Sequence, residues 1–90
     1  MATKEKPVKL TKAEQNLLDS LEVGKKPEVV YNELTGAKEL LEPQAVALFD
    51  FIKGMEYSIH IGKTKDIRLF DRARYLFLKL YPNAYMNLLD

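Results

Sequence analysis

The chain has no cysteine and only one histidine. Without cysteine, disulfide bonds, thiol catalysis and thiolate metal sites are excluded, and the composition is compatible with a reducing cytosol. His60 has no second histidine and no spaced set of carboxylates to accompany it. It therefore predicts neither a metal site nor a catalytic base, and we expect no metal and no cofactor.

Long apolar segments are also lacking. The N-terminus, MATKEKPVKL, has no apolar core of the signal-peptide type, and the longest nearly apolar run, YLFLKLY, is too short to span a bilayer. We therefore expect a soluble, cytoplasmic protein that does not contact membranes. Residues 1–9 are polar and charged and contain Pro7, which predicts a flexible arm ahead of a single domain at 10–90.

A phosphate-binding loop is absent, although Gly62-Lys63-Thr64 resembles the end of one. Such a loop needs another glycine five positions before the Gly-Lys pair, where this chain has Tyr57. Ile59 and Ile61 are β-branched and resist the positive φ angles of a phosphate loop. No hydroxyl side chain has the setting of an activated nucleophile, so we expect no enzyme; those considered are Thr11, Ser20, Thr35, Ser58 and Thr64.

No charge of one sign dominates, since 14 basic and 13 acidic residues leave a net charge of +1. The distribution is less even. Residues 1–52 carry seven lysines against nine acidic residues, whereas residues 53–90 carry seven basic against four acidic residues. The basic character is therefore C-terminal, and the whole-protein charge predicts no particular ligand.

What the sequence does contain is helical periodicity. Thr11 and Glu14 have the spacing of a capping box, and Pro27 and Pro43 suit the first turns of helices. Gly36 would end a short second helix. We expect an all-α fold, a small single-domain bundle of four helices near 11–23, 27–35, 43–57 and 65–81, with a short C-terminal helix near 83–89.

Two segments carry most of the core prediction. The helix near 43–57 is apolar around most of its circumference, which places Phe49 inside. In the stretch 57–70 the alternation of Tyr57, Ile59 and Ile61 is also compatible with a small hairpin. We prefer a loop followed by a helix. An isolated two-stranded ribbon has marginal stability, and the apolar residues from Ile67 to Phe77 recur at helical spacing. In the second predicted helix, Val30 and Leu34 would face inward.

A basic stripe is the most informative feature. On a helix near 65–81, the apolar residues fall on one side and a row of four cations around one tyrosine falls on the other: Lys65, Arg68, Arg72, Tyr75 and Lys79. Such a row suits phosphate oxygens or an acidic protein surface. The plain alternative is a solvated helix face.

Aromatic residues concentrate in the same half of the chain, with eight of the nine between Phe49 and Tyr85. This surplus indicates a protein contact and is compatible with a homodimer. We interpret the chain as a non-enzymatic adaptor or regulator that binds another macromolecule, in the first place a protein. The binding residues would be Lys65, Arg68, Arg72, Tyr75, Lys79, Tyr81 and Tyr85.

The alternative function is weak, sequence-nonspecific nucleic-acid binding through the cations Lys65, Arg68, Arg72 and Lys79. A short chain without cysteine or a catalytic motif is also typical of accessory proteins of phages and mobile elements, an origin with which this sequence is compatible.

Overall fold

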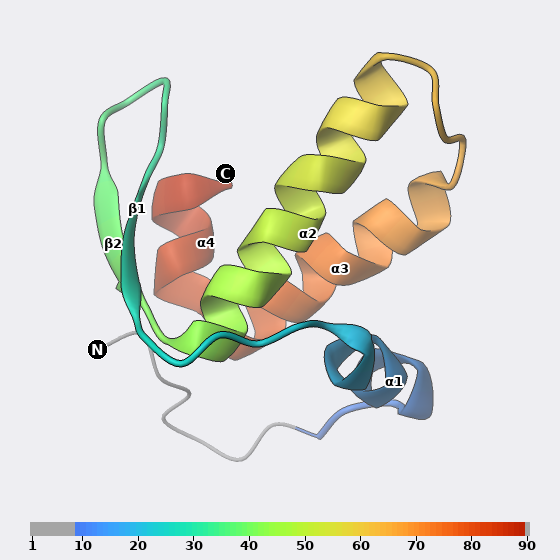
Figure 1. Ribbon diagram of the computed structural model, residues 1–90, viewed down its shortest axis with the longest axis horizontal. Coiled ribbons are helices and arrows are strands. Elements are labelled where there is room, and N and C mark those ends of the chain that lie inside the picture. The colour runs from blue at the N-terminus through green and yellow to red at the C-terminus, as the bar shows by residue number, and fades with distance from the viewer. Residues whose placement is uncertain (1–8, 90) are drawn as a thin grey trace.

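The computed structural model describes residues 9–89, so the predicted N-terminal arm, apart from Lys9, lies outside the described residues. Four helices and one hairpin follow one another along this part of the chain (Figure 1). They are α1 (Lys12–Ser20), β1 (Glu28–Tyr31), β2 (Lys38–Leu41), α2 (Pro43–His60), α3 (Ile67–Leu80) and α4 (Pro82–Leu88).

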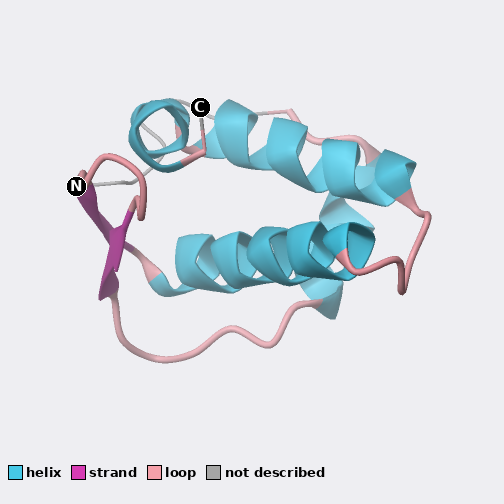
Figure 2. Cartoon of the chain, turned by 90° about the horizontal axis from the view of Figure 1, so that it is seen from above, coloured by secondary structure: helices cyan, strands magenta, loops and turns pink. Residues whose placement is uncertain are grey.

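The two longest helices, α2 and α3, lie side by side, and the hairpin lies against the start of α2 and against α4 (Figure 2). Pro43 begins α2, as predicted. The helix continues through His60 and is followed by Gly62 with a positive φ of 79°. The Asp66 side chain caps α3 by accepting a hydrogen bond of 3.1 Å from the backbone of Leu69. The alternative hairpin within 57–70 is therefore not formed. The predicted loop is confined to 61–66, because 57–60 continue α2, and the predicted helix follows it as α3.

One apolar core joins all the helices. Phe77 is fully buried, and its ring lies 6.3 Å from that of Phe49 and 5.3 Å from that of Tyr81, measured between centroids. The core positions predicted for Phe49 and Phe77 are thus confirmed. The other buried apolar side chains come from α1, β2 and the three C-terminal helices: Leu17, Leu18, Leu41, Ala45, Val46, Leu48, Ile52, Ala73, Leu76, Leu80, Ala84 and Leu88.

The helix predicted at 27–35 is wrong, because this segment forms β1 and the turn of an antiparallel hairpin. Val29, Val30 and Tyr31 are β-branched or aromatic and favour strands. Gly36, read as a helix stop, instead supplies the positive φ of 77° that the hairpin loop requires. The Asn32 side chain accepts hydrogen bonds from the next loop amides and stabilises the turn. The all-α prediction holds for four helices and fails for the hairpin.

The register of the hairpin gives it one covered and one open face. Val30 pairs with Glu39, and Glu28 pairs with Leu41, whose side chain is fully buried. β2 packs against α4, and both strands contact α2. Side chains on the opposite face are exposed, as is Leu34 at the tip, which is 96% exposed rather than inward as predicted.

Candidate functional site

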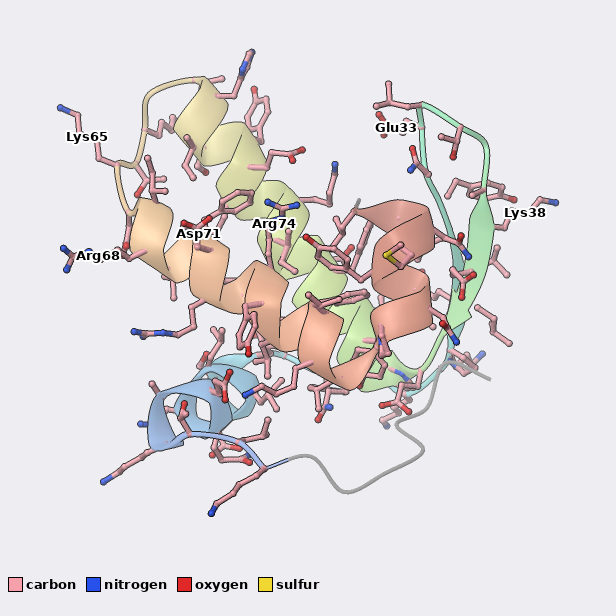
Figure 3. All side chains as sticks on the ribbon, turned by 180° about the vertical axis from the view of Figure 1, so that it is seen from behind. Glu33, Lys38, Lys65, Arg68, Asp71 and Arg74 are labelled. Carbon is pink, nitrogen blue, oxygen red and sulfur yellow. The ribbon has the colours of Figure 1, made fainter. Side chains whose placement is uncertain are left out.

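Four of the five residues of the predicted basic stripe lie on α3, whose inner side buries Ala73, Leu76, Phe77 and Leu80. The fifth, Lys65, lies in the loop two residues before this helix begins, not on the helix as predicted. Lys65, Arg68 and Arg72 are exposed, and the first two extend away from the body of the molecule (Figure 3). None of the three has a salt-bridge partner within residues 9–89. Tyr75, one turn beyond Arg72, is 59% exposed. We call Lys65, Arg68, Arg72 and Tyr75 the basic surface.

Acidic residues lie close to the basic surface in sequence, but in the part of the chain that the structure describes none of them forms a salt bridge with its cations. The Asp66 carboxylate serves as the N-cap of α3. Asp71 lies at the margin of the stripe and pairs with none of the surface cations. Uncompensated guanidinium groups at one-turn spacing are suited to carboxylate or phosphate oxygens, because the planar donor fork matches both.

Lys79, the last cation of the stripe, is engaged within the molecule. Its Nζ donates to both carboxylate oxygens of Glu14 on α1, at 2.8 and 3.0 Å. Lys79 also lies 5.2 Å from the centre of the Tyr75 ring. Because the charge of Lys79 is compensated, three cations of the stripe rather than four are without a salt bridge among residues 9–89.

Glu14 is buried and belongs to two arrangements at once. Its Oε1 accepts a 2.9 Å hydrogen bond from the backbone of Thr11, and its own N–H donates to Thr11 Oγ1 at 3.1 Å. This is the predicted capping box, which is confirmed. The hydrogen bond from Lys79 and the backbone N–H of Thr11 lower the pKa of the Glu14 carboxyl below its ordinary value. Glu14 therefore joins the start of α1 to α3.

Tyr81 is placed in the core, not on the surface, since only 2% of it is exposed. Its hydroxyl donates to Glu42 Oε1 at 2.6 Å and accepts from Gln44 Nε2 at 3.0 Å. Burial, followed by the hydrogen bond to Glu42, raises the pKa of Tyr81 above its ordinary value. Through these two hydrogen bonds, Tyr81 connects the α3–α4 junction to the start of α2.

Tyr85 is half-buried and lies beside Arg74, a residue outside the predicted site. The Arg74 Nη2 donates to the Tyr85 hydroxyl at 3.0 Å and to the carbonyl oxygen of Leu89 at 3.2 Å. The guanidinium group also lies over the rings of Phe70 and Tyr85, at 5.6 and 5.7 Å from their centres. Arg74 thus holds α4 against α3. Its sequence position between the polar and apolar sides of α3 was the only signal available.

The structure also brings together an apolar surface that sequence reasoning missed. In the register of the hairpin, Val29 lies opposite Leu40, and Tyr31 lies opposite Lys38. The three apolar side chains are each about half exposed, and Lys38 lies 5.8 Å from the Tyr31 ring centre and points outward (Figure 3). A helix prediction for 27–35 could not show this surface, because it places Val29 and Tyr31 on a helix and does not pair them with Leu40 and Lys38.

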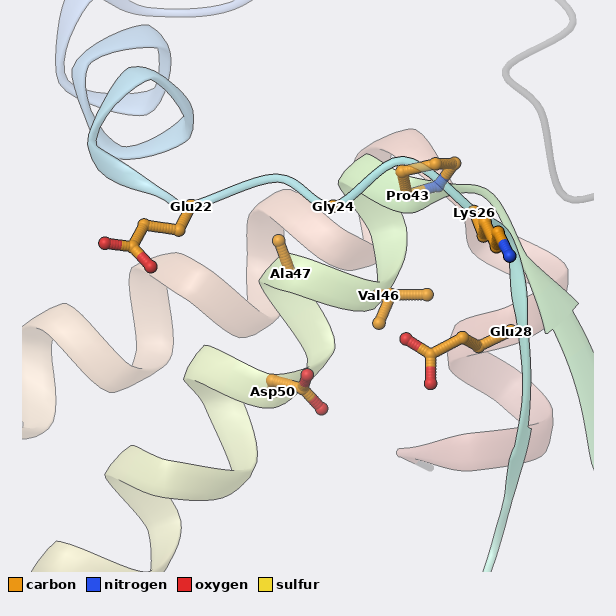
Figure 4. Close-up of a pocket in the computed structure, with 8 residues that line it drawn as sticks. All are labelled: Glu22, Gly24, Lys26, Glu28, Pro43, Val46, Ala47 and Asp50. Carbon is orange, nitrogen blue, oxygen red and sulfur yellow. The ribbon is translucent and has the colours of Figure 1, made fainter.

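A shallow pocket of about 220 Å³ lies between the segment after α1 and the first half of α2 (Figure 4). Polar groups predominate in it, with the carboxylates of Glu22, Glu28 and Asp50 and the amine of Lys26. The remaining lining residues are Gly24, Pro43, Val46 and Ala47, so the pocket walls supply no hydroxyl or imidazole. This set of side chains provides no nucleophile with a base to activate it.

The backbone groups of the Gly62-Lys63-Thr64 turn are directed into α2. The amides of Lys63 and Thr64 both donate to the carbonyl oxygen of Ser58, at 2.8 and 3.4 Å. The Thr64 hydroxyl accepts from the backbone of Asp66 at 3.2 Å. Amides engaged in closing a helix do not form the convergent set of donors that holds a nucleotide phosphate.

Comparisons with protein-family models, curated proteins and solved structures found no match to this chain. Within residues 9–89, none of the helices has both the length and the apolar composition that crossing a membrane requires.

Proposed function

We propose that this chain is a non-enzymatic adaptor that binds an acidic surface of another protein through Lys65, Arg68, Arg72 and Tyr75. The observation that carries the proposal is a group of three exposed cations without a salt-bridge partner in the described part of the chain: Lys65 in the loop before α3, and Arg68 and Arg72 on α3 itself. An exposed tyrosine at the end of such a group adds a rigid, amphipathic contact of the kind that is enriched at protein interfaces.

A protein partner accounts for these features better than a nucleic acid. The net charge of +1 gives little long-range attraction toward a polyanion. Asp66 and Asp71 lie within the same turns as the cations, where they would repel a continuous phosphate backbone. Acidic protein patches are smaller and discrete, so they can match three cations and avoid neighbouring carboxylates.

The test uses charge reversal with a matched control. The double substitution Arg68→Glu and Arg72→Glu removes the cations of the basic surface, whereas Lys25→Glu and Lys26→Glu makes the same change in net charge at exposed residues between α1 and β1. Affinity-tagged wild-type protein and both variants would be used to capture partners from cells of the source organism. We expect the first variant to lose the partner and the second to retain it.

Retention of the same partner at unchanged affinity by the Arg68→Glu/Arg72→Glu variant would contradict the proposal. Titration with duplex and single-stranded DNA at physiological ionic strength separates the two classes of ligand. Binding of either DNA that disappears in this variant but persists in the Lys25→Glu/Lys26→Glu control would favour nucleic acid and overturn the protein assignment.

A further inference from the structure

The docking of α1 on α3 shows, inside this molecule, what kind of segment the basic side of α3 accepts. α1 is a short amphipathic helix that carries a carboxylate, Glu14, and two buried leucines three and four residues later, Leu17 and Leu18. The carboxylate meets Lys79 at 2.8 Å, and the leucines join the core. An acidic amphipathic helix is therefore the natural complement of this side of α3.

α1 compensates only the C-terminal cation of the stripe. Arg68 and Arg72 lie further toward the start of α3, and no carboxylate within residues 9–89 forms a salt bridge with either of them. Apolar side chains accompany them, since Ile67 is 54% exposed and Tyr75 is 59% exposed. The first half of α3 thus presents unpaired cations beside exposed apolar side chains, whereas the cation in its second half, Lys79, is already paired with α1.

We infer that the partner presents an acidic amphipathic helix, which docks on the first half of α3 as a continuation of the contact made by α1. This inference rests on the proposed function and adds the chemistry of the partner. Arg68 and Arg72 are separated by about 6 Å along the helix axis, which is the separation of two carboxylates four residues apart on a partner helix. Apolar residues on the same side of that helix cover Tyr75 and Ile67.

A synthetic peptide provides the test, because the partner itself is not required. The probe is a fluorescent, lactam-bridged helix of about 14 residues, with glutamates and leucines repeating at three- and four-residue spacing on one side. A scrambled peptide keeps the bridge and composition but distributes these residues around the helix. A third peptide replaces each glutamate with lysine. Fluorescence anisotropy measures the binding of each to the full chain and to both charge-reversal variants.

We expect the amphipathic probe to bind the wild-type chain at protein concentrations below about 100 µM. The Arg68→Glu/Arg72→Glu variant should weaken this binding at least about tenfold, and the Lys25→Glu/Lys26→Glu control should leave it unchanged. The lysine peptide should bind the Arg68→Glu/Arg72→Glu variant better than it binds the wild type, because the charges are then complementary again.

Three results would overturn the inference. They are the absence of probe binding at that concentration, equal binding of the scrambled peptide, and binding that does not respond to Arg68→Glu/Arg72→Glu. If a partner is captured from cells through Arg68 and Arg72 while the probe does not bind, the proposed function stands. Only the inference that the partner presents an acidic amphipathic helix is then contradicted. If cellular capture is also insensitive to these arginines, both fail.

Discussion

Glu14 is a single side chain that both caps α1 and attaches that helix to α3. Sequence reasoning found the first role, because Thr11 and Glu14 are three residues apart and the capping box is local. It did not find the second role, since Lys79 lies 65 residues away in the chain. The same reason explains why Lys79 and Tyr81 looked like surface residues, whereas their partners, Glu14, Glu42 and Gln44, become neighbours only in the folded chain.

The Glu14 ion pair predicts a pH dependence of stability. Because the pKa of Glu14 is lowered in the folded state, the folded protein binds this proton less readily than the unfolded chain does. The stabilisation is present above the unfolded pKa of about 4.3 and is lost as the pH falls through the folded value. Glu14→Gln keeps the size of the side chain and an acceptor for Thr11, but it cannot titrate.

Thermal unfolding of both proteins between about pH 6 and about pH 3 checks this prediction. We expect wild type to be the more stable at the upper end of this range, and the difference in Tm to shrink on acidification. Other carboxylates titrate in both proteins, so only the difference between them reports Glu14. A difference in Tm that stays constant over the whole range would show that the ion pair with Lys79 adds nothing to stability.

At the scale of elements, the hairpin marks the limit of local sequence signals. Pro27 and Gly36 flank a segment in the way that a proline begins a helix and a glycine ends it. A strand that follows a proline and leads into a loop with a glycine gives the same sequence pattern. Strand propensity of Val29 to Tyr31 was the competing signal. The pairing of β1 with β2 and the packing of β2 on α4 decide the outcome, and neither contact can be read from the segment alone.

Two leucines of the hairpin region give a direct test of this assignment. Leu41 is fully buried in β2, so Leu41→Ala should lower the free energy of unfolding by about 2–5 kcal/mol. Leu34 is 96% exposed at the hairpin tip, so Leu34→Ala should change it by less than about 0.5 kcal/mol. Urea denaturation measures both values. A large loss for Leu34→Ala would instead support the inward position predicted for a helix.

For the whole molecule, stability depends on one core in which Phe77 is central. This residue has no exposed surface and packs against rings from α2 and from the α3–α4 junction. Phe77→Ala should lower the free energy of unfolding by about 3–5 kcal/mol, which is a large share of the total free energy of unfolding of a small domain. The variant should show reduced helical circular dichroism at 37 °C (about 310 K) or a strongly lowered urea midpoint.

Replacement of the exposed Tyr75 by alanine is the matched control for Phe77→Ala, since both residues are aromatic and both lie on α3. We expect Tyr75→Ala to stay close to wild type in stability, with a change of less than about 1 kcal/mol. Equal losses of unfolding free energy in the two variants would mean that the side of α3 that carries Phe77 does not face the core. Unchanged stability in Phe77→Ala would contradict the central position of this ring.

The separation between Glu14 and Lys79 along the chain also has a consequence for the order of folding. α2, α3 and α4 follow one another directly and pack against their neighbours in sequence, so their contacts close short loops. Attachment of α1 closes a far longer loop and requires α3 to be in place, so we expect it to be a late step of folding. During synthesis, the α1 segment leaves the ribosome before α3 is made, so the helix on which it packs is not yet available. Until α3 emerges, we expect Leu17 and Leu18 to remain exposed to solvent and the Glu14 carboxylate to lack its ion-pair partner, Lys79.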